Sequence, residues 1–300
     1  MDYASDVVQV SWGERLDLFR WAILAALFAG AVCPLVGAFL LVRRTSFYGI
    51  ALPQFATAGV VFGFILLPWW VETIGLGGLD TLTAVSDSHA AMNFHLAWAA
   101  VFTFGGLLAL VLTGRRGGSE VGRVAAAFAI ASAATYLFAR ISPIGKAFVD
   151  ELLQGEILTV GMHELETLAA VFAGVALAIA VFHRDFLLVS HDRELALVLG
   201  KRVVGYEILL NGITGVTVAT GTMICGPTLL FGLLVLPPLA ARRWAGSMGS
   251  FYGISVALGL LAVAGGIVAS FELDLPLGAA IVGVAALELV PGVVFRRALS

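Results

Sequence analysis

Residues 19–44 read FRWAILAALFAGAVCPLVGAFLLVRR, an apolar run that ends in two arginines. The run contains the roughly 20 residues that an α-helix needs to cross about 30 Å of hydrocarbon. Hydrocarbon offers no hydrogen-bond partner to the backbone, so a spanning segment must be a helix or a strand of a closed barrel. The run lacks the alternation of apolar and polar residues that barrel strands show. It therefore predicts a transmembrane helix that leaves the membrane at the arginines.

The same pattern recurs along the whole chain, of which 60% is hydrophobic and only 12% charged. A soluble domain is roughly a quarter charged. We therefore predict an all-α, polytopic transmembrane helical bundle with about 8–9 spanning helices. Two of the segments abut at Gly226-Pro227, so eight spans and a re-entrant piece are the alternative to nine. The apolar segments are 19–42, 47–70, 96–114, 121–139, 164–182, 203–225, 227–241, 249–271 and 276–295.

The N-terminal residues carry several carboxylates before the first apolar run, unlike the basic start of a cleavable signal peptide. We expect an outer N-terminal segment over 1–18 and a single transmembrane domain over 19–300. Cys33 and Cys225 both lie inside apolar runs, so we expect buried thiols rather than a disulfide framework.

The basic residues are distributed unequally between the two sides of the predicted membrane. Thirteen of the 17 lysines and arginines fall on one side, and only Arg15, Arg20, Arg140 and Lys146 fall on the other. The side rich in lysine and arginine is the cytoplasmic one. The N-terminus is then outside, the C-terminus inside, and the long connection over 71–95 outside.

Several kinds of chemistry lack their sequence signature. Gly145-Lys146 and Gly200-Lys201 have neither the upstream glycine nor the following Ser or Thr of a phosphate-binding loop. His163-Glu164 does not continue into the His-Glu-x-x-His pattern of zinc hydrolases. We therefore expect no enzyme activity, no cofactor and no nucleic-acid partner, with membrane lipid as the surroundings of the chain.

Four stretches, taken in order, resemble a known family. They are GAFLLVRRTSFYGIALPQFATAG (37–59), DRELALVLGKRV (192–203), GPTLLFGLLVLPPLAARRWA (226–245) and DLPLGAAIVGVAALELV (274–290). Their order and spacing resemble the zinc/manganese/iron-type ABC transporter permease family over about Leu24–Val294.

The resemblance implies a permease subunit in the bacterial cytoplasmic (inner) membrane that imports a divalent metal ion, namely zinc, manganese or iron. It also implies three kinds of partner: a separate ATP-binding subunit, an extracytoplasmic substrate-binding protein and a second copy in a homodimer. Two other functions stay open, an ion-coupled secondary carrier or channel, and a transport-inactive membrane scaffold of the same fold.

The stretch from Asp192 to Gly200 matches the coupling segment of the family, with Glu194, Leu195 and Ala196 at the family spacing. The resemblance implies a short helix that seats in a groove of the ATP-binding subunit. Its apolar anchors and the charges at its start suit such a role. An ordinary solvated turn between helices is the alternative.

The resemblance departs from the family where a metal would be bound. Family members usually carry an acidic residue after the glycine of the second helix and a histidine four positions later, but this chain has Ile50 and Gln54 there. Isoleucine cannot ligate a metal and a neutral amide ligates weakly. Either the substrate differs, or the metal passes with little coordination, or transport has been lost.

Other polar residues in the apolar segments are few. Glu288 is predicted in the middle of the last helix, where a carboxylate suggests a substrate path or proton relay, or a neutral packing role. Glu207 and Asn211 share a helix face. Asp87, His89 and His95 are expected together in the long outer loop, as weak candidates for cation capture.

We expect Ser88→Cys, in a background without Cys33 and Cys225, to react with a membrane-impermeant maleimide in intact cells, because the charge asymmetry places 71–95 outside. A cysteine at Arg115 should react only after lysis. The reverse pattern of labelling would overturn the predicted topology.

Overall fold

The computed structural model describes residues 12–43, 45, 47–74, 89–114, 119–142 and 160–290. This part of the chain is helical and contains no strand, which confirms the predicted all-α class. The helices are α1 (Trp12–Leu18), α2 (Arg20–Val42), α3 (Tyr48–Ile74), α4 (His89–Gly114), α5 (Glu120–Ile141), α7 (Met162–His191), α8 (Arg193–Val198), α9 (Val203–Cys225), α10 (Pro227–Ala241), α11 (Met248–Leu273) and α12 (Leu277–Leu287).

Seven of these helices are long and apolar enough to cross a membrane, namely α2, α3, α4, α5, α7, α9 and α11. The other two apolar helices, α10 with 15 residues and α12 with 11, are shorter. At 1.5 Å per residue they measure about 22 and 16 Å, less than the roughly 30 Å of a bilayer core. The predicted count of eight or nine is thus roughly consistent with seven full spans and two shorter helices.

Two predicted segments differ from the helices that form. The segment expected over 164–182 is the longer helix α7, which continues through the polar residues His183, Arg184 and Asp185. Charges end an apolar segment, but they do not end a helix. Polar residues likewise do not end α4, which begins at His89 and not near residue 96. The connection expected over 71–95 is therefore shorter than predicted.

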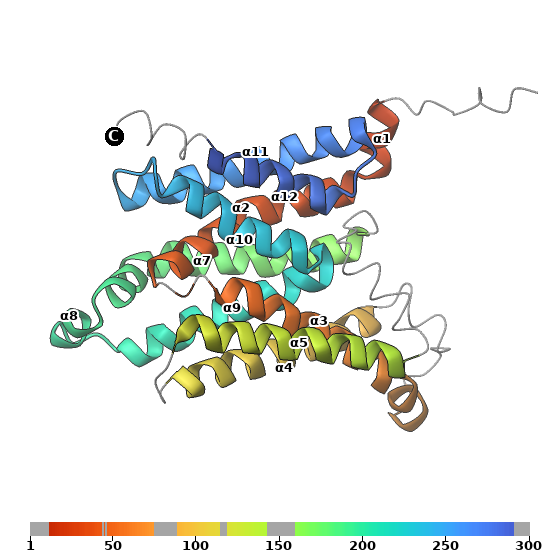
Figure 1. Cartoon of the computed structure of the whole chain (residues 1–300), viewed down its shortest axis with the longest axis horizontal. Helices are drawn as coiled ribbons and strands as arrows, with labels where there is room; N and C mark the ends of the chain where they lie inside the picture. The colour runs from red at the N-terminus through yellow and green to blue at the C-terminus, as the bar shows by residue number, and fades with distance from the viewer. Residues whose placement is uncertain are drawn as a thin grey trace, which may run out of the picture.

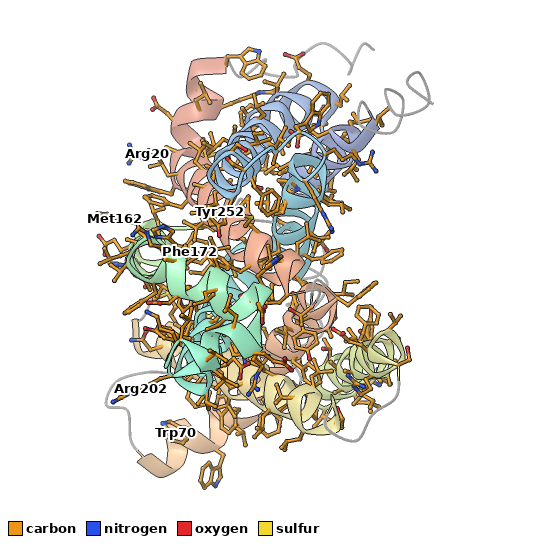
Figure 2. The ribbon with its side chains drawn as sticks, turned by 90° about the vertical axis from the view of Figure 1, so that its left-hand side faces the viewer. Arg20, Trp70, Met162, Phe172, Arg202 and Tyr252 are labelled. Carbon is orange, nitrogen blue, oxygen red and sulfur yellow. The ribbon has the colours of Figure 1, made fainter. Side chains whose placement is uncertain are left out.

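The helices form two groups that meet at α9 (Figures 1 and 2). One group holds α3 with α4 and α5, and the other holds α2 with α10, α11 and α12. Helix α9 contacts members of both groups as well as α7, and two thirds of its most apolar window is buried. It therefore links the two groups, which also meet directly where α10 contacts α3.

Glycines allow α2 to cross its neighbours at very short distance. A Cβ at Gly37 would overlap the carbonyl oxygen of Leu234 in α10, and a Cβ at Gly259 in α11 would overlap the carbonyl oxygen of Gly30. Pro34, which has no N–H to donate to the Gly30 carbonyl, also lies against Gly259. Small residues of this kind let helix backbones approach within lipid, where burial of apolar surface gives little driving force.

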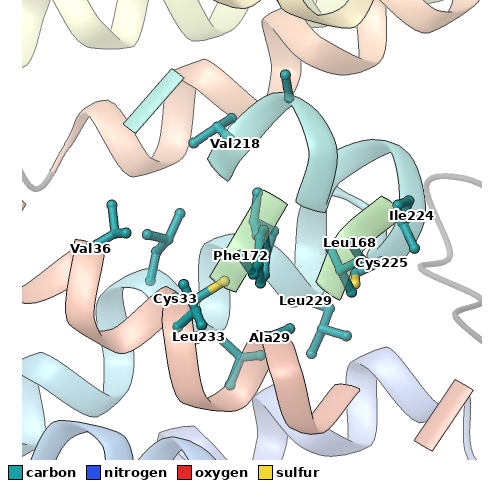
Figure 3. Packing of buried hydrophobic residues seen from close by; sticks show 14 of the residues in the cluster. Ala29, Cys33, Val36, Leu168, Phe172, Val218, Ile224, Cys225, Leu229 and Leu233 are labelled. Atoms are coloured by element: carbon teal, nitrogen blue, oxygen red, sulfur yellow. The ribbon is translucent and has the colours of Figure 1, made fainter. Parts of the chain in front are cut away.

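The main core lies where α2, α7, α9 and α10 meet (Figure 3). Phe172 of α7 is fully buried there, surrounded by small and branched side chains such as Ala29, Leu229 and Leu233. Cys33 and Cys225 are both free and buried in this core, which confirms their predicted burial.

The two ends of the bundle differ in charge. We call them the α8 end and the α1 end, after the helices that mark them in Figure 1. Of the eleven lysines and arginines in the described residues, only Arg15, Arg20 and Arg140 lie at the α1 end. The other eight lie at the α8 end, as the predicted asymmetry requires. Its assignment to the cytoplasm stays a prediction.

The described part of the expected outer segment, helix α1, packs on the end of α11. The Trp12 ring meets Phe271 edge-on at 5.6 Å between centroids, and Arg15 Nη1 donates a hydrogen bond of 2.7 Å to the Phe271 carbonyl oxygen. This helix is separated from α2 by a break at Phe19.

We expect Gly37→Ala to lower the free energy of unfolding by about 2 kcal/mol or more, because the new methyl group would meet backbone that cannot rotate away. Gly174→Ala is the matched control, since a Cβ at Gly174 in α7 meets nothing within 4 Å. Thermal unfolding in detergent measures both. Equal melting temperatures for the two variants would contradict the proposed close crossing.

Candidate functional site

The segment predicted as a coupling helix forms a capped helix between α7 and α9. Asp192 is the N-cap of α8, and its Oδ1 accepts a hydrogen bond from the Leu195 N–H at 2.9 Å. Gly200 follows the helix with φ +72, a conformation that glycine adopts without strain. The N–H groups of Gly200 and Lys201 donate to the carbonyls of Leu197 and Ala196 and close the helix end. The sequence therefore encodes both ends of α8.

Helix α8 buries one side chain and exposes the others. Ala196 is fully buried against Val189 of α7 and Val203 of α9. Ala196 is thus a packing residue of α8. Four apolar side chains are exposed instead: Leu195, Leu197, Val198 and Leu199, with Val198 at 84%. Asp192 and Glu194 are exposed beside them.

Ion pairs hold α8 to the helices on either side. Lys201 Nζ lies 2.6 Å from Asp185 Oδ1 of α7, and the Tyr206 hydroxyl donates to Asp185 Oδ2 at 3.0 Å. Hydrogen bonding to Asp185 raises the pKa of the Lys201 ammonium, so the pair stays charged at neutral pH. Arg193 Nε lies 3.0 Å from Glu207 Oε1 of α9. Solvent screens exposed pairs of this kind, so their main effect here is to orient α8.

Glu207 and Asn211 lie one turn apart on α9, as the sequence predicts, and each has a partner. Glu207 pairs with Arg193, and Asn211 Oδ1 accepts a hydrogen bond of 2.8 Å from Arg43 Nη1 at the end of α2. The sequence predicted only that Glu207 and Asn211 share a face of their helix. The identity of the partners came only from the structure.

Ile50 and Gln54 lie in the first two turns of α3, at the α8 end of the bundle, and both are half-buried. Gln54 Oε1 accepts a hydrogen bond from the Ser132 hydroxyl of α5 at 3.4 Å, the long limit for such a bond. Neither residue is among a group of three or more His, Cys, Asp or Glu side chains placed to hold a metal, and the described residues contain no such group.

Glu288 lies at a break in the last helical segment, between α12 and the helical residues Leu289 and Val290. Helix α12 ends at Leu287, and Glu288 is its C-cap residue. One carboxylate oxygen, Oε2, is buried and has no hydrogen-bond partner among the described residues. A buried carboxylate oxygen without a partner costs free energy, so Glu288 stays a candidate residue of the substrate pathway.

The histidines expected in the outer loop do not lie together there. Asp87 lies outside the described residues, whereas His95 is inside α4 and buried. The His95 ring stacks on Phe64 at 4.1 Å between centroids, and Nδ1 lies 3.3 Å from the Val60 carbonyl oxygen of α3. The prediction for His95 was wrong. Aromatic neighbours accommodate its ring inside the bundle, so α4 begins before the apolar run does.

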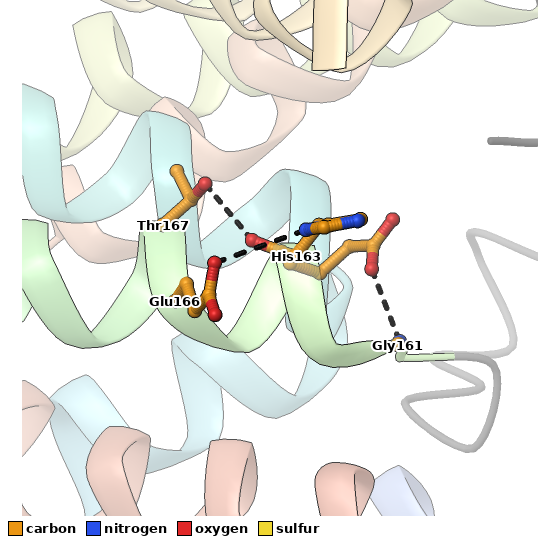
Figure 4. Close-up of polar contacts among 5 residues, drawn as sticks. Gly161, His163, Glu166 and Thr167 are labelled. Atoms are coloured by element: carbon orange, nitrogen blue, oxygen red, sulfur yellow. Dashed lines mark hydrogen bonds and ion pairs between the residues drawn. The ribbon is translucent and has the colours of Figure 1, made fainter. Parts of the chain in front are cut away.

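The stretch around His163 makes local contacts at the start of α7 (Figure 4). The Gly161 N–H donates to Glu164 Oε2 at 3.1 Å, the Thr167 hydroxyl donates to the His163 carbonyl at 3.0 Å, and His163 Nδ1 lies 3.8 Å from Glu166 Oε2. These contacts cap the helix, and they converge on no substrate site.

A cavity of about 710 Å³ opens beside α8, between the ends of α2 and α7 and the start of α11. Its polar lining includes Arg43, His191 and Arg242. Since His191 directly precedes Asp192, the cavity and the exposed face of α8 form neighbouring parts of one surface.

The chain matches a known protein family over nearly its whole length. A family model described as the ABC 3 transport family matches residues 15–296. The chain belongs to this family. Membership confirms the predicted resemblance and makes the chain a multi-pass membrane component of a transporter.

Relatives in the ABC 3 transport family carry names of metal transport systems. The manganese import system permease protein ScaB of Streptococcus parasanguinis is 26% identical over 90% of this chain and 87% of its own length. The zinc transport system membrane protein TroC of Treponema pallidum is 25% identical over 83% of this chain and 79% of its own length. Among solved structures, PsaBC from Streptococcus pneumoniae in complex with Fab superimposes with a TM-score of 0.73 at 22% identity. That match covers 92% of both chains and shows a shared fold.

We expect Ile50→Asp combined with Gln54→His to bind Zn²⁺ at least tenfold more tightly than the native chain, because it places two true ligands one turn apart on α3. Calorimetric titration of the purified protein in detergent measures the affinity.

The matched control is Ile254→Asp combined with Leu258→His, because Ser250-Phe251-Tyr252-Gly253-Ile254 at the start of α11 repeats the local sequence of residues 46–50. The control pair supplies the same ligands elsewhere. An equal gain from both pairs would mean that the α3 position has no special role.

Proposed function

We propose that this chain is the permease subunit of an ATP-driven importer of a divalent metal ion, namely zinc, manganese or iron, in the bacterial cytoplasmic membrane. In this proposal it works as a homodimer with a separate ATP-binding subunit and an extracytoplasmic substrate-binding protein. The family membership and the names of the relatives support the class of substrate.

The observation that carries the proposal is the geometry of α8. A helix of six residues exposes Leu195, Val198 and Leu199 while Ala196 anchors it to the bundle. Exposed apolar side chains on a rigid, capped helix suit insertion into a groove of another protein. The cavity beside it, lined by Arg43, His191 and Arg242, suits acidic side chains of the same partner.

The residues Ile50 and Gln54 of α3 bear on how the substrate is bound. Ile50 contributes no ligand, and the Gln54 amide is directed to Ser132. We propose that the metal crosses this level with little coordination by the protein, so that it is released quickly. Selection of the metal then falls to the extracytoplasmic substrate-binding protein.

We expect Leu195→Asp to reduce co-purification of the ATP-binding subunit at least tenfold, because it places a carboxylate where the groove would receive an apolar side chain. The matched control is Leu16→Asp on α1, at the opposite end of the bundle, since Leu16 and Leu195 are 44% and 46% exposed. Undiminished co-purification of the Leu195 variant, with ATP-driven metal uptake intact, would rule out docking at α8.

A further inference from the structure

A line of polar contacts leads away from α8 into the bundle. It begins with the pair of Arg193 and Glu207, which joins α8 to the first turns of α9. One turn further along α9, Asn211 accepts the hydrogen bond from Arg43. Arg43 is the C-cap of α2, and the chain enters α3 five residues later at Tyr48.

Glu207 stands between two arginines of different elements. It is bonded to Arg193, and its charge also acts on Arg43. Burial lowers the pKa of Arg43, and the nearby Glu207 carboxylate opposes that shift. The guanidinium of Arg43 is thus a half-buried charge that is hydrogen-bonded to Asn211 of α9 and lies near Glu207 of α9 and Tyr48 of α3. A movement of α9 without Arg43 would break its hydrogen bond to Asn211.

Arg43 lies where the chain passes from one group of helices to the other. Arg43 ends α2, which belongs to one group, while Tyr48 begins α3, which belongs to the other. Helix α9 contacts both groups. Apolar contacts between helices permit sliding, whereas hydrogen bonds and ion pairs are directional and hold a defined geometry.

We propose that Glu207 and Asn211 act as positioning residues that carry a movement of α8 through α9 to Arg43, and so to the junction of α2 and α3. The inference rests on the proposed docking of α8 on the ATP-binding subunit. In this inference, the junction of α2 and α3 is the part of the permease that responds to ATP. The junction leads directly into the turns of α3 that hold Ile50 and Gln54.

The simpler alternative is that these contacts only stabilise the α8 end. Distance measurements distinguish the relay from this alternative. Loss of a purely structural contact lowers stability but leaves the ATP-dependent movement of the α2–α3 junction unchanged. Three positions suit spin labels: Phe47 at the junction, Val198 on α8 and Leu16 at the opposite end, which are 43%, 84% and 44% exposed. Cys33 and Cys225 are replaced by alanine in all proteins.

The experiment uses the complex with the ATP-binding subunit in detergent, with and without ATP, Mg²⁺ and vanadate, and pulsed EPR to measure distances. In the native chain we expect both the 198–16 and the 47–16 distances to shift with ATP. Asn211→Leu, which is close in size and removes the acceptor, should keep the 198–16 shift and lose the 47–16 shift. Asn211→Asp, which keeps an acceptor for Arg43, should retain both shifts.

The control is Thr214→Val, since the buried Thr214 hydroxyl bonds only to the Leu210 carbonyl of its own helix, at 2.9 Å. It should retain both shifts. If Asn211→Leu does not assemble, Arg43→Met interrupts the same contact from the other side and should give the same loss.

The outcomes distinguish the inference from the proposed function. A 47–16 shift that persists in Asn211→Leu or Arg43→Met would overturn the relay alone. A native complex in which the 198–16 distance does not respond to ATP would overturn both the relay and the proposed role of α8.

Discussion

Hydrocarbon supplies no hydrogen-bond partner, and the structure of this chain follows from that constraint. Backbone groups within the membrane must be satisfied inside each helix, and charged side chains must reach the ends of the bundle or find partners. The same rule explains why eight of the eleven described lysines and arginines gather at the α8 end and three at the α1 end. The basic side chains that the structure describes are accordingly concentrated at one end.

Since lipid is as apolar as the side chains, the helices associate through close fit rather than through burial alone. Gly30, Gly37 and Gly259 permit the tight crossings of α2 with α10 and α11, and Phe172 fills the space between α7 and its neighbours. Such packing joins helices but leaves few directional contacts between the two groups. The hydrogen bond between Arg43 and Asn211 supplies a directional contact between α2 and α9.

Helix α8 is firmly held by its neighbours and yet exposes most of its side chains. Helix α8 is capped by Asp192 and Gly200, buried at Ala196, and paired through Lys201 and Arg193 to α7 and α9. Its exposed leucines and valine are thus presented on a fixed base. A permease that receives its energy from a partner requires a contact of this kind, because a flexible loop would absorb the movement.

Sequence by itself determined the all-α class, the approximate positions of the apolar helices, the stretch that forms α8 and the family. These features depend on local properties: run length, capping residues, a glycine with positive φ and the order of motifs. The resemblance also implied that Ile50 and Gln54 stand where family members usually carry metal ligands, because residue identity needs no coordinates. Only the tertiary structure placed His95 inside α4 against Phe64, brought Gln54 to Ser132, and paired Arg43 with Asn211 across 168 positions of the chain. Such contacts depend on how helices far apart in sequence lie against each other, and the periodicity of a single helix carries no information about the partner that it meets.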